Sequence, residues 1–113
     1  MVLNPGAVGV SLHSKGKAQF MILKGKKGAW DYKFISLDYN KEKVVTDLNR
    51  SGLAEKAPFW CEVTENLLKT GEISHGTVLS KAMTLCANKY GKCNWPKVLD
   101  ECWEEAIKQI IKI

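Results

Sequence analysis

The feature that most constrains the fold of this chain is a tight turn near its start, residues 3–9 (LNPGAVG). Pro5 fixes its own φ and favours extended geometry at Asn4, while Gly6 and Gly9 permit positive φ or the close approach of another backbone. Such residues are typical of a corner where a strand ends and a loop begins. Almost no strand sequence precedes the corner here.

Two strands are predicted after the turn. Residues 19–23 and 30–37 carry the residues that favour strands, and residues 24–28 (KGKKG) form the predicted loop between them. Alternation of side chains places three aromatic residues on one face of the second strand and two aliphatic residues on the other, namely Trp30, Tyr32 and Phe34 against Ile35 and Leu37. A two-stranded hairpin alone is marginal in water, so we expect further strands or helices to cover it.

Four helices are predicted in the later half of the chain. Residues with capping or first-turn chemistry begin them, and glycines end the first three: Asn40, Pro58, Ser74 and Asn94, then Gly52, Gly71 and Gly91. Apolar residues recur at helical spacing in each: Val44, Val45 and Leu48; Trp60, Val63 and Leu67; Val78, Ala82, Leu85 and Cys86; Leu99, Trp103, Ile107 and Ile110. The sequence therefore predicts an α+β fold, a short antiparallel β-hairpin followed by about four α-helices, with a boundary at residues 51–57.

Length and composition indicate an ordered chain with one core. The chain has 113 residues, of which 45% are hydrophobic, and four tryptophans, so it is no disordered tail. No apolar run approaches the roughly 20 residues of a membrane span. The start also lacks the basic stretch and apolar segment of a secretory signal. We therefore expect a cytoplasmic, reducing location and no membrane partner.

The four cysteines, Cys61, Cys86, Cys93 and Cys102, lack the spacing of a metal site. None stands in a Cys-x-x-Cys pair, and no histidine follows at a zinc-finger offset. Three of them fall on apolar helical faces, where a free thiol behaves as a small hydrophobe. We expect reduced, buried thiols and no metal bound by this chain.

The positive charge is concentrated in the first part of the chain. Residues 1–43 hold eight lysines and three acidic residues, which gives 8 − 3 = +5, and the rest holds nine of each sign. This field could attract phosphate-bearing partners. Lysines on loops and edge strands also serve simply to keep a hairpin solvated and to prevent it from pairing with other chains. Both interpretations stay open from the sequence.

Residues 4–9 (NPGAVG) resemble a signature, Asn-Pro-Gly-Ser-Val-Gly, near the end of small bacterial calcineurin-like metallophosphoesterases (phosphodiesterases), with Ala7 in place of the usual serine. The hairpin, the connector Asp38-Tyr39 and the helix ending in residues 51–53 (SGL) follow in the order seen in that family. The resemblance implies that residues 1–53 are the end of its sheet. It further implies that residues 54–113 are a helical C-terminal extension, and that a larger α/β sandwich phosphoesterase lies upstream.

The resemblance also implies which chemistry the parent protein would perform and what this chain lacks for it. The family binds two divalent metal ions, such as manganese, through motifs of the type Asp-x-His, Gly-Asp-x-x-Asp, Gly-Asn-His and Gly-His-x-His. None of the four occurs here, and the only histidines, His13 and His75, stand in different elements. Two-metal hydrolysis needs clustered carboxylates and imidazoles. We therefore expect no catalytic residue in this chain and no hydrolysis by the chain alone.

Six residues are predicted to lie beside a phosphoester substrate in the parent: Asn4, Gly6, Ala7, His13, Lys15 and Lys17. The first three would line the edge of the site, or would only shape the corner. Residues 13–17 (HSKGK) offer point charges and a close-approaching glycine, although the loop has no Walker spacing and departs from the arginine- and aspartate-bearing loop of the family. His75, beside the Ser74 cap, is expected to be structural.

A rival hypothesis is a stand-alone binding module. The basic hairpin would then bind nucleic acid, or the helices would bind a protein. As a phosphoesterase segment, the chain would have the catalytic part upstream as its partner. A hairpin cut from the sheet of such a parent would expose a strand edge and an apolar face, so we expect self-association, by edge pairing or by exchange of the N-terminal segment in a homodimer.

Overall fold

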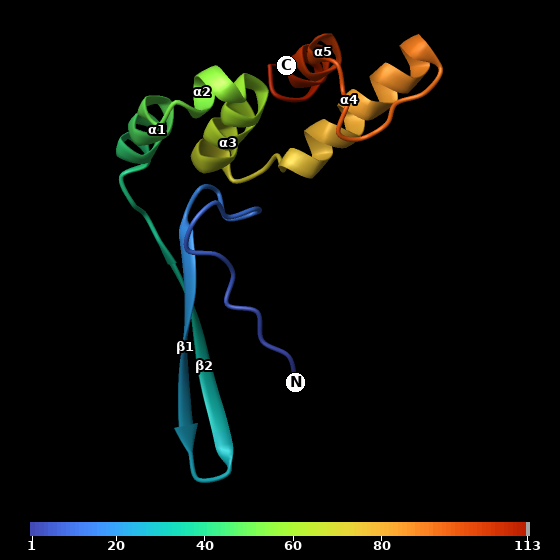
Figure 1. The fold of residues 1–113 in the computed structure, drawn as a ribbon. Helices are drawn as coiled ribbons and strands as arrows, with labels where there is room; N and C mark the ends of the chain where they lie inside the picture. Colours follow the sequence, from blue (N-terminus) through green and yellow to red (C-terminus); the bar gives the residue numbers. More distant parts are fainter. Residues whose placement is uncertain (113) are drawn as a thin grey trace.

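The two strands form one antiparallel hairpin that projects from the helices (Figure 1). In the computed structural model, which describes residues 1–112, β1 spans Ala18–Lys26 and β2 spans Ala29–Leu37. Their register runs from Ala18 opposite Leu37 to Lys26 opposite Ala29. The molecule is correspondingly elongated, 62 × 32 × 24 Å.

The predicted loop at residues 24–28 is wrong, because the strands continue through most of it. Only Lys27 and Gly28 connect the strands, and Gly28 adopts φ 73°, a left-handed conformation that glycine allows at little cost. Gly25 stays paired within β1 because its missing side chain makes room for the ring of Trp30. A Cβ at Gly25 would lie 2.9 Å from that ring.

The hairpin has two unlike faces. The aromatic face comprises Met21 and Leu23 of β1 together with Trp30, Tyr32 and Phe34 of β2, and Met21 lies opposite Phe34 and Leu23 opposite Tyr32. The mixed face is apolar near the helices and charged toward the turn, with Phe20, Ile22, Ile35 and Leu37 followed by Lys24, Lys26, Asp31 and Lys33. Within residues 1–112 no helix packs on either strand, so the cover expected from the sequence is not supplied by the helices.

Five helices follow the hairpin, four of them where the sequence predicts helices. They are α1 (Lys41–Arg50), α2 (Leu53–Lys56), α3 (Pro58–Thr70), α4 (His75–Tyr90) and α5 (Asp100–Ile110). The short α2 lies in the stretch expected to be a boundary. None of the helices described here is long and apolar enough to cross a lipid bilayer.

The predicted ends of α1, α3 and α4 are confirmed by their caps. The Asn40 side chain accepts a hydrogen bond from the Lys43 amide at 3.0 Å, and the Ser74 hydroxyl accepts one from the Thr77 amide at 3.2 Å. Gly71 and Gly91 end α3 and α4 in the left-handed conformation. Local capping chemistry therefore defines the helical half.

The predicted cap at Asn94 is wrong. Helix α5 begins at Asp100, and Leu99 is its cap residue. Pro96 has no amide hydrogen to donate and disfavours helical geometry at the residue before it. The segment after Asn94 therefore forms a turn, in which the Lys97 amide donates to the Asn94 carbonyl at 2.8 Å.

The core lies between α3, α4 and α5. Its buried members are Val63, Val78, Ala82, Cys86, Cys102, Ala106 and Ile107. Three predicted inward residues are instead substantially exposed: Val44, Trp60 and Leu99. Helix α1 packs mainly through Val45, its one buried residue, against α2 and α3. Trp60 lies on a side of α3 that the core does not cover.

Candidate functional site

The turn at the start of the chain closes on itself. The Asn4 side-chain oxygen accepts a hydrogen bond from the Gly6 amide at 3.0 Å. Gly6 adopts φ 84°, and a Cβ there would lie 2.6 Å from the side-chain oxygen of Gln19. The Asn4 oxygen thus shapes the corner, and Gly6 lets the corner approach the base of β1.

The same turn joins the outer edge of β1. The Gln19 amide donates to the Ala7 carbonyl at 2.9 Å, so this amide points away from β2. Because amides alternate in direction along a strand, those of Met21 and Leu23 point outward as well. The start of the chain therefore marks the edge at which the sheet can continue.

The loop of residues 13–17 is docked on the C-terminal end of α3. Its His13 amide donates to the Gly71 carbonyl at 2.5 Å. A Cβ at Gly16 would lie 2.9 Å from the carbonyl oxygens of Leu68 and Lys69. His13 and Lys15 both have positive φ, 59° and 54°, which is uncommon for residues other than glycine. The loop backbone is therefore fitted to the carbonyls that end the helix, which carry a partial negative charge.

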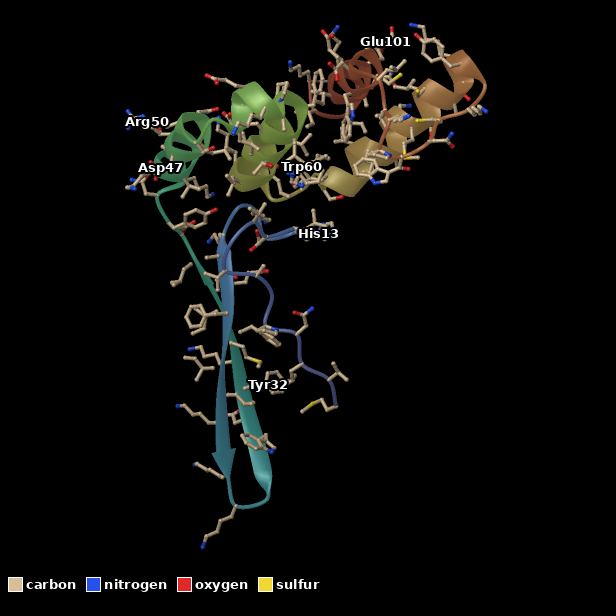
Figure 2. The ribbon with its side chains drawn as sticks, viewed as in Figure 1. His13, Tyr32, Asp47, Arg50, Trp60 and Glu101 are labelled. Atoms are coloured by element: carbon tan, nitrogen blue, oxygen red, sulfur yellow. The ribbon has the colours of Figure 1, made fainter. Side chains whose placement is uncertain are left out.

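The side chains of this loop are more open than its backbone. His13 and Lys15 are exposed, and the Lys15 carbonyl accepts from the Lys41 ammonium at 3.5 Å. The Lys17 ammonium lies 3.6 Å from the carboxylate of Asp38, which follows β2 at the same end of the hairpin. Of the six residues predicted to lie beside a substrate, Asn4, Gly6 and Ala7 thus lie in the turn beside β1, and His13 and Lys15 lie in the loop docked on the end of α3. Lys17 lies where this loop enters β1, beside Asp38. Figure 2 shows His13 below the helices, at the head of the hairpin.

His75 belongs to a small cluster that links α3 to α4. Its ring stacks on Trp60 with centroids 4.1 Å apart, and its Nε2 lies 2.7 Å from the Thr64 hydroxyl. That hydroxyl donates to the Trp60 carbonyl at 2.7 Å, so its oxygen is free to accept from Nε2–H. Burial lowers the pKa of His75. The cluster thus consists of Trp60 and Thr64 of α3 and His75, the first residue of α4. The helical pattern of the sequence did not predict it.

The four cysteines are free thiols. Cys61, Cys86 and Cys102 are buried and Cys93 is half-buried. Burial raises the pKa of Cys61, Cys93 and Cys102, which keeps these thiols protonated at neutral pH. In the part of the chain that the structure describes, no three histidine, cysteine, aspartate or glutamate side chains are arranged to hold a metal ion.

Another hollow lies between α4 and α5, remote from the residues singled out in the sequence. It has a volume of about 550 Å³, and its lining includes Lys89, Glu101, Glu105 and Lys108. Glu101 accepts hydrogen bonds from the Lys89 ammonium at 2.7 Å and from the Tyr90 hydroxyl, and the bond from Lys89 is the main reason that its pKa is lowered. Two ion pairs, Lys89 with Glu101 and Lys108 with Glu104, take up four of its charged side chains.

Two further hollows lie on the hairpin and combine lysine with aromatic side chains. One, of about 270 Å³, is lined by Lys24, Lys26, Ala29, Trp30 and Asp31. The other, of about 210 Å³, is lined by Ile22, Lys24, Asp31, Tyr32 and Lys33. Three of the eight lysines of residues 1–43 therefore lie beside aromatic rings on a concave part of the ribbon.

Comparison with family models, with curated proteins and with solved structures gives no match to this chain.

Proposed function

We propose that this chain is the C-terminal segment of a calcineurin-like metal-dependent phosphoesterase, with the catalytic part upstream of it. In this proposal the chain extends and supports the catalytic sheet. Its turn at Asn4, Gly6 and Ala7 borders the substrate, and the loop of His13, Lys15 and Lys17 adds positive charge nearby. The substrate would be a phosphoester, and the location would be the cytoplasm.

The observation that carries the proposal is the hydrogen bond from Gln19 to Ala7. It holds the Asn-Pro-Gly turn at the outer edge of β1, with unused strand amides continuing beyond it. A strand that entered Asn4 from upstream would run beside this edge. The order of turn, hairpin, connector and Ser-Gly-Leu helix end supplies the second support.

The metal ions of such an enzyme would be held by the upstream part. His13 lies in the loop beside α3, while His75 is occupied by Trp60 and Thr64, and the described residues offer no donor set for a divalent ion. The residues of this chain would therefore position and orient the phosphoester substrate, and they would not activate the attacking water. Asn4 and Gly6 would hold the corner, and the two lysines would attract the phosphoester as point charges.

The test is to read the DNA upstream of the Met1 codon and to express whatever precedes it in frame. The proposal expects the four metal-binding motifs there. It also expects the joined protein to release nitrophenol from bis(p-nitrophenyl) phosphate with manganese. An upstream sequence without the motifs, or a joined protein with the motifs and no turnover, would refute the proposal.

A further inference from the structure

We infer that the hairpin binds single-stranded nucleic acid, with bases stacked on its aromatic face and phosphates held by its lysines. The inference concerns residues of this chain alone, so it stands or falls separately from the phosphoesterase proposal. Phosphoester hydrolysis and nucleic-acid binding both involve phosphodiesters, but the two proposals use different surfaces of the hairpin. The proposed sheet extension uses the outer edge of β1, and nucleic acid would use the faces of the ribbon.

The aromatic face offers three rings in a row. Trp30, Tyr32 and Phe34 are 67%, 44% and 53% exposed, and no helix of residues 1–112 covers them. Alternate residues of a strand lie about 6.7 Å apart, so successive rings can each receive a base from an extended strand. Stacking on aromatic rings tolerates any base, because every base has a π-face. Tyr32 and Phe34 meet edge to face at 5.5 Å, which leaves part of each ring surface open.

Lysines lie within reach of these rings. Lys24, Lys26 and Lys33 belong to the mixed face, and Lys27 forms the turn with Gly28. The ribbon is only two strands wide, about 5 Å between strand axes, so a long lysine side chain can reach around its edge. The two hollows of the hairpin bring Lys24 beside Trp30 in one case and beside Tyr32 in the other. Lysines of the mixed face therefore border the rings of the aromatic face in both hollows.

Charge favours a polyanion at this end of the molecule. The hairpin, residues 18–37, holds four lysines and one aspartate, which gives 4 − 1 = +3 of the excess of five in residues 1–43, while residues 44–113 sum to zero. A strand of phosphates would be drawn to the hairpin. An anionic lipid surface is the weaker candidate, because the rings are spread along the ribbon while the tip carries Lys26 and Lys27. Inserting that tip into hydrocarbon would bury two ammonium groups.

The experiment measures binding of fluorescein-labelled single-stranded DNA and RNA oligonucleotides of mixed sequence to the full chain by anisotropy. The variant Trp30→Ala is expected to weaken binding at least about 10-fold. Replacing Lys24, Lys26 and Lys27 by glutamine is expected to flatten the dependence of log K on log salt by about 0.7 for each phosphate that is no longer neutralised. Circular dichroism checks that each variant keeps its helices.

Matched controls come from the helical half. Trp95→Ala removes another exposed tryptophan, and glutamine at Lys56, Lys92 and Lys97 removes the same charge from exposed sites. Neither control should change affinity or salt slope appreciably. Equal losses in control and hairpin variants would show diffuse charge attraction and overturn the inference. So would no binding by the wild type at 50 mM salt, or binding to phosphatidylserine vesicles with no binding to oligonucleotides.

Discussion

His75 and Trp60 lie face to face, with ring centroids 4.1 Å apart and an interplanar angle of 28°. The histidine is the first residue of α4 and the tryptophan lies near the start of α3, so the pair joins two helices at one point. Protonating the ring there would place a positive charge at the positive end of α4.

The stability of the chain is therefore expected to depend on the charge of His75. Because burial lowers its pKa, folding favours the neutral ring. This stabilisation is fully present above the ordinary pKa of about 6.5 and is lost as the pH falls below it through the folded-state pKa. Urea unfolding at pH 7.5 and pH 5.5 should show the loss. His75→Gln should reduce it, and His13→Gln should leave it in place. Equal pH dependence in both variants would contradict the prediction.

Gly71 and Gly91 form a matched pair of helix ends. Both adopt the left-handed conformation, but a Cβ at Gly71 would lie 2.5 Å from the Gly16 nitrogen, while a Cβ at Gly91 would meet nothing within 4 Å. Alanine at Gly91 should cost about 1–2 kcal/mol from backbone strain alone. Alanine at Gly71 should cost a further 1–3 kcal/mol, roughly, from crowding.

Urea unfolding measures both costs. Proteolysis between residues 13 and 17 should also accelerate in the Gly71→Ala variant, because the loop would lose its place on α3. An equal loss in the free energy of unfolding for the two alanine variants would mean that the loop of residues 13–17 moves away easily and is only weakly docked on α3.

The chain is expected to self-associate through the hairpin. Outward amides on β1 and the uncovered aromatic face both recruit other surfaces. Light scattering at micromolar concentration should give a mass above 12.6 kDa. Leu23→Lys should reduce the mass toward the monomer, while Trp95→Lys, at an exposed site elsewhere, should not. A monomer mass at this concentration would contradict the prediction, and protected hairpin amides in that monomer would mean that the ribbon is stable without a second copy.

The chain alone is expected not to hydrolyse bis(p-nitrophenyl) phosphate in the presence of manganese. Its two histidines lie apart, and the described residues present no cluster of metal-binding side chains. The measurement is nitrophenol release by purified protein. Turnover that survives His13→Ala and His75→Ala together, and that vanishes with a chelator, would mean that other residues bind the metal.

The sequence predicted the helices and strands of this fold better than the contacts that these elements make with other segments. Capping residues such as Asn40 and Ser74 accept hydrogen bonds from amides three residues away, so the helix starts that they define can be predicted from the local sequence. The turn at Lys27-Gly28 was misplaced because pattern alone could not show that Trp30 packs over Gly25. The start of α5 was misplaced because Asn94 has capping chemistry, but Pro96 disfavours helical geometry at Trp95, the residue that would begin the helix after that cap.

The candidate site was less predictable, because it depends on contacts between distant segments. The lysines and glycine of residues 13–17 suggested contact with phosphate, yet their docking on Gly71, more than fifty residues later, is visible only in the fold. Trp60 was assigned to the core by its spacing, and its partner His75 comes from another helix. Periodicity reports which face of a helix is apolar and says nothing of a neighbour that covers a different face.

Because no described helix rests on β1 or β2, the hairpin and the helical core share few interactions through which stability could pass. Unzipping the ribbon from the Lys27-Gly28 end would leave Val63, Val78 and Ile107 in place. The two parts should therefore behave as separate cooperative units. In the monomer, amide exchange should be rapid along the ribbon and slow in α3, α4 and α5. Anything that clamps the ribbon, a second copy included, should protect its amides while leaving the melting of the helices unchanged.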